Sequence, residues 1–174
     1  MFFKKIAAGF LSLVCIFMLC SCKGEKTSAA PDLNKLFTGT ASIACGDFTA
    51  EATINRLGNG MWDVEFTSPK TLSGVKLSFN GDEITASYLG LKFTVPKDTA
   101  PVKGVLRMLF DAVDKTSEKA DTVCTQKDGQ MILDGEINSE KFKIIFNKET
   151  GALSAFEVPD KDLKIEFSSY SEIQ

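Results

Sequence analysis

From Thr40 onward, apolar and polar residues alternate along the sequence with a period of two. Residues 48–55 are one such run, and the turn Gly58-Asn59-Gly60 joins them to a second run at residues 62–67. Strict alternation predicts a β-strand with one buried face, and a glycine-rich break between two such runs predicts a hairpin. The chain is therefore expected to fold mainly as an antiparallel sheet with one side in water.

The same pattern continues nearly to the C-terminus, with turn residues at the spacing that is typical of an antiparallel meander. The remaining predicted strands are residues 75–80, 84–88, 91–95, 122–126, 131–137, 142–146, 153–158 and 163–167.

One segment, residues 101–115, departs from the alternation. Its apolar residues, among them Leu106, Leu109 and Phe110, recur at spacings of three and four, which predicts a helix with one apolar stripe. Residues 31–37 predict a second, short helix. The longer helix has two interpretations, a fixed part of the core or a movable lid.

About ten strands at ~4.8 Å spacing make a flat sheet roughly 48 Å wide, whereas a helix is only about 10–12 Å across. Since one or two helices cannot cover such a sheet, the sheet must curl. The predicted fold is mainly β with minor α, an unclosed half-barrel of about ten antiparallel strands covered by one or two helices.

A curled sheet of this size either encloses an apolar hollow or packs solid. The large apolar residues of the strands and of the longer helix are the candidates to line a cavity, and their alternative role is a solid core. They are Phe48, Trp62, Phe66, Phe79, Phe93, Leu106, Leu109, Phe110, Phe142, Phe146, Phe156 and Phe167.

The N-terminus has the order of a secretory signal peptide, because Lys4 and Lys5 precede an apolar run at residues 6–19. The run is shorter than the roughly 20 residues that span a bilayer. We predict a signal peptide at residues 1–21, a tether at residues 22–30 and a β domain at residues 31–174.

The tetrapeptide Leu19-Cys20-Ser21-Cys22 resembles the lipobox of bacterial lipoproteins. By that resemblance Cys22 becomes the first residue and carries a diacylglycerol group and fatty acyl chains such as palmitate. Two acyl chains hold a protein stably on a membrane. The resemblance implies an extracytoplasmic protein that is lipid-anchored to the cell membrane.

Removal of residues 1–21 leaves 18 basic and 23 acidic residues. The surface is therefore acidic overall, and neither nucleic acid nor anionic headgroups are expected as partners. Cys45 and Cys124 are the cysteines that remain besides Cys22. They form either a disulfide, worth about 4 kcal/mol in the loop-entropy model, or two buried thiols.

The sequence contains no histidine. The commonest general base and metal ligand is therefore missing, and two remaining thiols are too few for a structural zinc site. Pairs of carboxylates occur at turns, where a solvated surface is the favoured interpretation. We expect no enzyme activity, no cofactor and no metal.

Residues 60–69, an aromatic strand that ends in Ser-Pro, and residues 81–88, a strand that ends in Tyr, resemble the LolA and LolB lipoprotein-carrier superfamily. The resemblance implies an unclosed β-barrel with helices in its mouth and a concave face that holds acyl chains. GerS-type lipoproteins, which resemble the same fold, imply instead a partnership with a cell-wall hydrolase.

The sequence departs from this family in one respect. The soluble carrier closes its mouth with an arginine on an early strand, and this chain offers only Arg56, beside a turn, and Arg107, on the helix. A chain anchored at Cys22 also cannot cross a periplasm. The expected function is binding of a lipid, a lipoprotein or another apolar ligand by a tethered receptor, and the alternative is a scaffold for an envelope protein partner.

Overall fold

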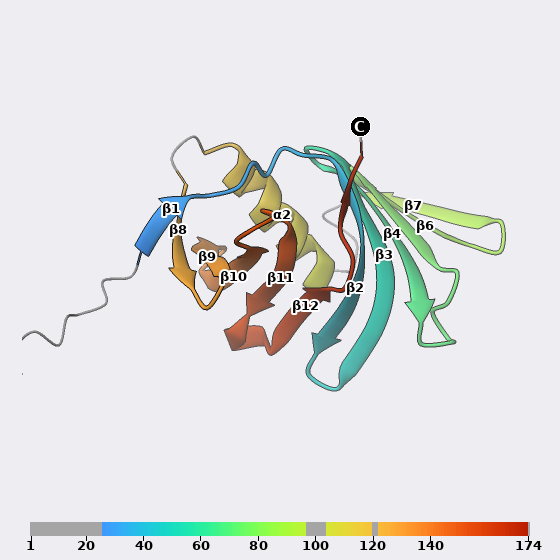
Figure 1. The fold of residues 1–174 in the computed structure, drawn as a ribbon. Helices are drawn as coiled ribbons and strands as arrows, with labels where there is room; N and C mark the ends of the chain where they lie inside the picture. The colour runs from blue at the N-terminus through green and yellow to red at the C-terminus, as the bar shows by residue number, and fades with distance from the viewer. Residues whose placement is uncertain (1–25, 97–103, 120–121, 174) are drawn as a thin grey trace, which may run out of the picture.

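The computed structural model describes residues 26–96, 104–119 and 122–173, which form one large antiparallel sheet curled around a single helix (Figure 1). Twelve strands follow one another across the sheet in the order β1-β8-β9-β10-β11-β12-β2-β3-β4-β5-β6-β7, and β13 pairs with β2. Because β1 and β7 end the order without pairing with each other, the sheet is an unclosed half-barrel, as predicted.

The first half of this order consists mostly of strands from the C-terminal part of the chain. These strands are β1 (Lys26–Ala29), β8 (Val123–Lys127), β9 (Gln130–Ile137), β10 (Glu140–Asn147), β11 (Leu153–Val158) and β12 (Leu163–Phe167), with a short 3-10 helix, η1 (Pro159–Lys161), between the last two.

The other half is a continuous meander. Its strands are β2 (Phe37–Cys45), β3 (Phe48–Gly58), β4 (Met61–Ser68), β5 (Lys76–Asn80), β6 (Glu83–Tyr88) and β7 (Leu91–Pro96), and the short β13 (Ser171–Glu172) lies beside β2. The pairing of β12 with β2, in which Ile165 lies opposite Ile43, joins the two halves.

The alternation of the sequence corresponds to the two faces of the sheet. In β3, Ala50, Ala52 and Ile54 are buried, whereas Glu51 between them is exposed. All ten predicted strands are present, and β1, β2 and β13 are additional. The predicted fold class is confirmed.

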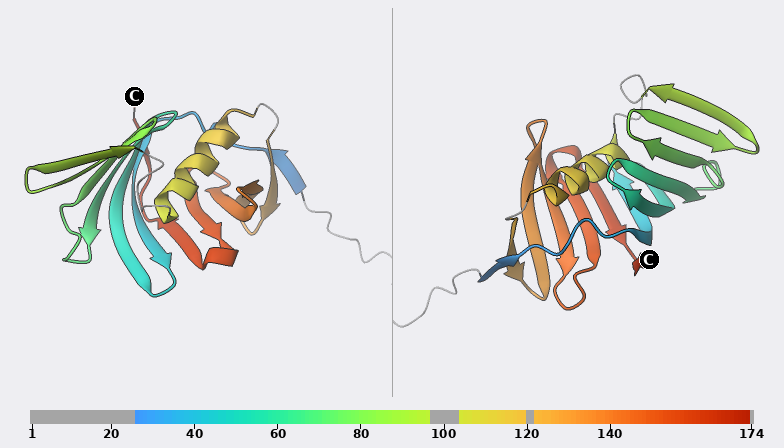
Figure 2. Two further views of the ribbon diagram at one scale, coloured as in Figure 1. Left: turned by 180° about the vertical axis from the view of Figure 1, so that it is seen from behind. Right: turned by 90° about the horizontal axis from the view of Figure 1, so that it is seen from above.

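Helix α2 (Val105–Ser117) lies across the concave face of the sheet (Figure 2). Its apolar stripe, which includes Leu106, Leu109 and Phe110, is buried against the strands. The stripe was predicted from spacing alone, and the residues just before Gly104 lie outside the described ranges.

The predicted helix at residues 31–37 is wrong. Leu33 and Asn34 form a turn, and Phe37 begins β2. The ring of Phe37 stacks on Tyr170 at 4.9 Å and meets the edge of Trp62 at 5.7 Å. Contacts with residues far along the chain therefore override a local pattern of about two turns, which is too short to be stable alone.

The predicted tether at residues 22–30 is also partly wrong. Lys26–Ala29 forms strand β1 and pairs with β8, so that Ser28 lies opposite Cys124. The segment is short and polar, so its sequence does not alternate enough to predict a strand. It becomes a strand because the edge of β8 offers backbone N–H and C=O groups with which it pairs.

Among the described residues, no helix is long and apolar enough to cross a membrane. The same residues contain no group of three or more acidic, cysteine or histidine side chains that could hold a metal ion.

Candidate functional site

Helix α2 fills the middle of the concave face with packed side chains. Phe110 stacks on Trp62 of β4 with 4.3 Å between ring centroids and meets the edge of Phe79 of β5 at 4.9 Å. Leu109 is fully buried in the same cluster. This part of the concave face is therefore a packed core.

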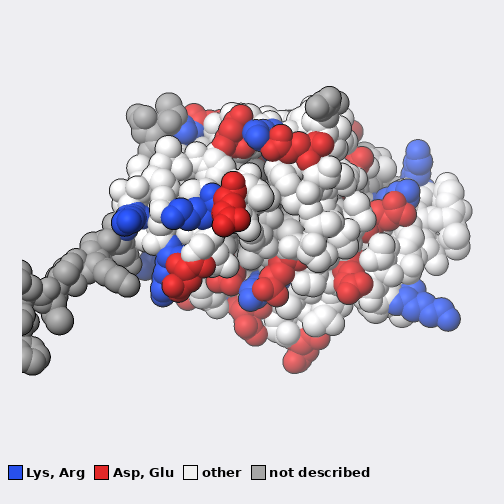
Figure 3. Space-filling view, viewed as in Figure 1, with Lys and Arg blue, Asp and Glu red and all other residues white. Residues whose placement is uncertain are grey.

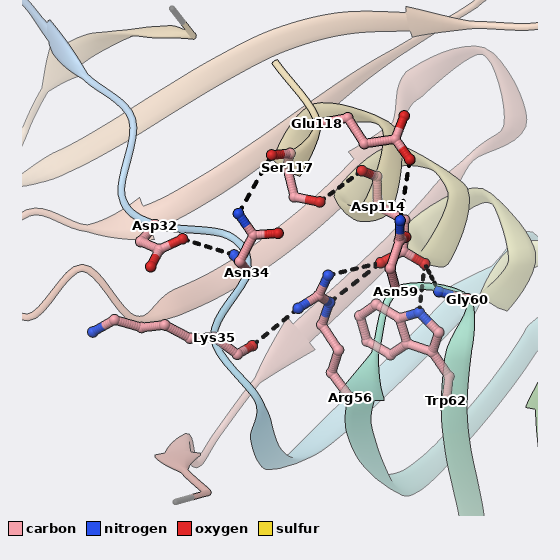
Figure 4. Close-up of polar contacts among 10 residues, drawn as sticks. All are labelled: Asp32, Asn34, Lys35, Arg56, Asn59, Gly60, Trp62, Asp114, Ser117 and Glu118. Atoms are coloured by element: carbon pink, nitrogen blue, oxygen red, sulfur yellow. Dashed lines mark hydrogen bonds and ion pairs between the residues drawn. The ribbon is translucent and has the colours of Figure 1, made fainter. Parts of the chain in front are cut away.

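A buried arginine fastens the helix to the sheet (Figure 4). Arg56 of β3 is 1% exposed. Its Nε and Nη2 donate to Oδ1 of Asp114 on α2 at 3.2 and 3.0 Å, and its Nη1 donates to the carbonyl oxygen of Lys35 at 3.2 Å. A guanidinium of this kind is stable in the interior only because its donors are satisfied.

The second oxygen of the Asp114 carboxylate holds the turn between β3 and β4. Its Oδ2 accepts hydrogen bonds from the backbone N–H of Gly60 at 3.0 Å and from Nε1 of Trp62 at 2.9 Å. One carboxylate therefore joins helix, strand and turn. The sequence offered no clear latch between an early strand and the helix, and in the structure Arg56 provides one.

Beyond the helix, the concave face is uncovered at its outer end. We call β6 and β7 the outer hairpin; it projects from the body of the molecule (Figures 1 and 2). Across the hairpin, Ala86 lies opposite Phe93 and Tyr88 lies opposite Leu91. These residues continue the row of Phe79 and Ile84 on the concave side, yet Leu91 is 63% and Phe93 67% exposed.

A second accessible region is the groove between α2 and the β9–β10 hairpin. It consists of two adjoining hollows of about 550 and 340 Å³, which both reach Ile137. Leu133, Gly135 and Phe142 form part of the apolar floor, and the rims are charged.

Ion pairs occupy the rims of this groove where it passes Ile137. Arg107 and Asp111 pair along the helix at 3.4 Å, and Lys161 pairs with Glu140 at 2.8 Å. The hydrogen bond to Glu140 raises the pKa of Lys161, so this amine is charged at neutral pH. The groove therefore presents charged rims, whereas the concave side of the outer hairpin is apolar.

Most of the predicted cavity residues lie together in one continuous core. Phe142 also borders the groove beside α2. The buried ones are Trp62, Phe66, Phe79, Leu106, Leu109, Phe110, Phe142, Phe146 and Phe156, and Phe167 is half-buried at the edge of the same cluster.

Phe48 and Phe93 are not in this core. Phe48 begins β3 at the rim of the sheet, and Phe93 lies on the outer hairpin; both are exposed. Their place in the alternation predicted a buried position, but burial also requires a helix above that face, and α2 does not extend over either residue.

The alternative of a disulfide is not realised, because Cys45 and Cys124 are both free thiols. Cys45 ends β2 and Cys124 lies in β8, five strand positions away in the sheet, or roughly 24 Å at ~4.8 Å per strand. A disulfide needs Cα atoms within about 7 Å. Burial raises the pKa of the Cys124 thiol and keeps it protonated.

The predicted lipidation site, Cys22, lies outside the described residues, as does the whole predicted signal peptide. It remains a prediction from the lipobox resemblance.

Sequence reasoning missed the partnership of Arg56 with Asp114 and the exposed row of the outer hairpin. One signal was available for the first: Arg56 stands in the buried phase of β3, two positions after Ile54. For the second there was none, since Leu91 and Phe93 alternate like any buried row.

The sequence matches no protein-family model and no curated protein. Among solved structures, the fold is similar to that of an uncharacterized conserved protein from Thermus thermophilus, with a TM-score of 0.52, 12% identity and 82% of each chain covered. Likeness at this identity establishes the fold alone.

Two further structures are more distant. A LolA superfamily protein from Nitrosomonas europaea has a TM-score of 0.43 and 10% identity over 84% of this chain and 89% of that one. The complex of the CwlD amidase with the GerS lipoprotein from Clostridioides difficile has a TM-score of 0.42 and 11% identity over 98% of this chain and 92% of the matched one. At these TM-scores we draw no conclusion about this chain from either structure.

Proposed function

We propose that this protein is a membrane-anchored lipoprotein of the cell envelope that binds an acyl chain or another apolar ligand on the concave face of its sheet. The observation that carries this proposal is the exposed apolar row on the concave side of the outer hairpin, with Leu91 and Phe93 more than half exposed. An apolar surface of this kind is a typical mark of a binding site.

The position of the row also supports a ligand. Ile84 and Phe79, which lie in the same row, are buried and belong to the core. An acyl chain laid across Phe93 and Ala86 would extend this core outward and remove more apolar surface from water, at about 25 cal/mol per Å². The absence of histidine from the sequence favours binding without chemical conversion.

The anchor rests on the lipobox resemblance of residues 19–22. Cys22 precedes the start of β1 by four residues, a span of at most ~14 Å. A lipidated Cys22 would therefore keep the domain close to the membrane, where acyl chains are available.

The test is binding of a fluorescent fatty acid to the domain that begins at Lys26, which contains every described element and the whole described core. Phe93→Ala should weaken binding about tenfold, because the ring supplies a large share of the contact area. Val123→Ala is the matched control, since Val123 is 58% exposed at the other end of the sheet. Equal affinity of both variants and the unaltered domain, or no binding at all, contradicts the proposal.

A second candidate function is association with an envelope protein. The observation that favours it is the position of β7 at the edge of the sheet, where the backbone can add a strand from a partner. A photoreactive residue at position 91 would then cross-link to one protein reproducibly, and one at position 123 would not. Lipid adducts alone at position 91 would favour the ligand instead.

A further inference from the structure

The tip of the outer hairpin contains a leucine that neither the turn nor the core explains. Leu89 and Gly90 form the two-residue turn between β6 and β7, with φ of 48° and 84°. Leu89 is 85% exposed. The other non-glycine residues of positive φ in the described ranges are Asp128, Asn138, Ser139 and Asp162.

Two-residue hairpin turns with positive φ at both positions favour Asn, Asp or Gly at the first position, because a larger side chain is strained there. Leucine is therefore an unfavourable choice for this turn. An exposed leucine also gains nothing from burial in the fold. Strain without a folding reason is a mark of a functional position.

The surroundings of Leu89 are apolar and locally basic. Tyr88, Leu91 and Phe93 are exposed beside it. From Ile84 to Pro96 the sequence has one charged residue, Lys92. Figure 3 shows this end of the molecule as an uncoloured surface with basic side chains above and below it.

The neighbouring loop adds to the basic character of the tip. Tyr88 lies close to Gly74, since a Cβ on that glycine would be 3.8 Å from the Tyr88 ring. This places the loop between β4 and β5, with the exposed Lys70, next to the tip. Lys76 begins β5 after this loop but is paired with Glu65 at 2.9 Å.

The acidic residue of the hairpin itself is far from the tip. Glu83 stands at the opposite end of β6, where it pairs across the hairpin with Pro96. Five residues therefore separate its carboxylate from Leu89 along an extended strand, about 20 Å at ~3.3 Å per residue. The charge at the tip is set by Lys92 and Lys70.

We propose that the tip of the outer hairpin inserts into the surface of a lipid bilayer that contains anionic phospholipid. Leu89, Leu91 and Phe93 enter the boundary between headgroups and acyl chains. The Tyr88 hydroxyl stays at headgroup level, and the amines of Lys92 and Lys70 meet the anionic headgroups. The 23 acidic against 18 basic residues that remain without residues 1–21 argued against such lipids, but the charge of the tip is local and positive.

This contact does not require the ligand site, although Leu91 and Phe93 take part in both. Leu89 lies in the turn, beyond the concave row that would hold a ligand. The tip and β1 are at opposite ends of the sheet order. If Cys22 is lipidated, the two attachments would hold the sheet along the membrane with its outer end on the bilayer.

The test is flotation of the domain that begins at Lys26 with vesicles of phosphatidylcholine, with and without phosphatidylglycerol. The unaltered domain should float with the anionic vesicles. Leu89→Asn should lower partitioning about tenfold, equivalent to about 1.4 kcal/mol, while its unfolding midpoint stays the same or rises because Asn suits the turn. Lys92→Gln should lower partitioning about fivefold, and only with phosphatidylglycerol.

The matched controls lie at the other end of the sheet, on β8. Val123→Asn and Lys127→Gln change an exposed apolar and an exposed basic residue there, and both should partition like the unaltered domain. A domain that does not float, or a Leu89→Asn variant that floats as well as the unaltered one, overturns the proposal. Fatty-acid binding should be unchanged in Leu89→Asn, so a failure of the ligand proposal is seen separately.

Discussion

Strands β9 to β5 and the outer hairpin follow the same alternating pattern, but the side chains that α2 buries belong to the first set. Under the helix, Phe110 packs between Trp62 and Phe79, and the concave side chains are buried. On the outer hairpin, Phe93 occupies an equivalent phase of its strand and is 67% exposed. The same residue type thus stabilises the fold in one region and is available for contact in the other.

The region under α2 therefore stabilises the fold, whereas the outer hairpin offers apolar side chains for binding. Burial under α2 is accompanied by the Arg56 and Asp114 network, which fixes the helix in position. The outer hairpin has no such cover among the described residues. We therefore expect substitutions in the covered region to change the free energy of unfolding, and substitutions in the hairpin to change binding.

The largest expected effect comes from one substitution compared at two phenylalanines. Phe110→Ala should lower the free energy of unfolding by about 3–5 kcal/mol, because it leaves a cavity in a packed core. Phe93→Ala should change it by less than about 0.5 kcal/mol. Urea unfolding followed by tryptophan fluorescence measures both. Similar losses in the two variants would mean that the hairpin is covered in solution.

The next effect concerns the buried ion pair. Asp114→Ala should cost about 3 kcal/mol, because the guanidinium of Arg56 stays buried without a counter-charge. Asp111→Ala on the same helix is the control and should cost less than about 1 kcal/mol, since its pair with Arg107 is partly exposed. If both variants lose equally little, the helix is not held by this pair.

A smaller effect is expected where a strand passes under an aromatic ring. A Cβ on Gly135 would lie within van der Waals radii of the Phe142 ring, its cross-strand partner. Gly135→Ala should therefore cost about 1–3 kcal/mol by overpacking. Adding Phe142→Leu to that variant should restore part of the loss, as a double-mutant cycle would measure. Strictly additive losses would refute the contact.

The smallest expected effect concerns the reactivity of the two cysteine thiols. In the folded domain an aromatic disulfide reagent should modify Cys45, which is half-buried, long before Cys124, which is buried. Burial raises the pKa of Cys124, so the unfolded thiol ionises first and the folded state loses a little stability as the pH rises above about 8.5. Equal modification rates, or a disulfide after purification without reductant, would contradict this arrangement.

Local periodicity made much of the fold predictable. Alternation around Ala52 and the stripe around Leu109 are set by which residues face a core, and neither needs knowledge of distant partners. The helix predicted at residues 31–37 is wrong because this segment depends on a distant partner. Phe37 begins β2 and stacks on Tyr170, near the other end of the chain.

The candidate site was less predictable, because it depends on what lies above each strand. Arg56 could have been suspected from its buried phase in β3, but its partner is 58 residues away on the helix. The separation of Cys45 from Cys124 likewise follows from strand order, which alternation does not specify. Phe48 and Phe93 were predicted to be buried from their place in the alternation. That pattern does not show whether a helix covers the sheet at those positions.

The amino-acid sequence alone determined that the chain forms a wide antiparallel sheet with a helix around Leu109, and that it contains no histidine. Only the tertiary structure decided which strands the helix covers. The physical reason is size: α2 has 13 residues, about 20 Å at 1.5 Å per residue, and the sheet has thirteen strands. A helix of that length leaves part of the apolar face uncovered, and strand order places that part at β6 and β7.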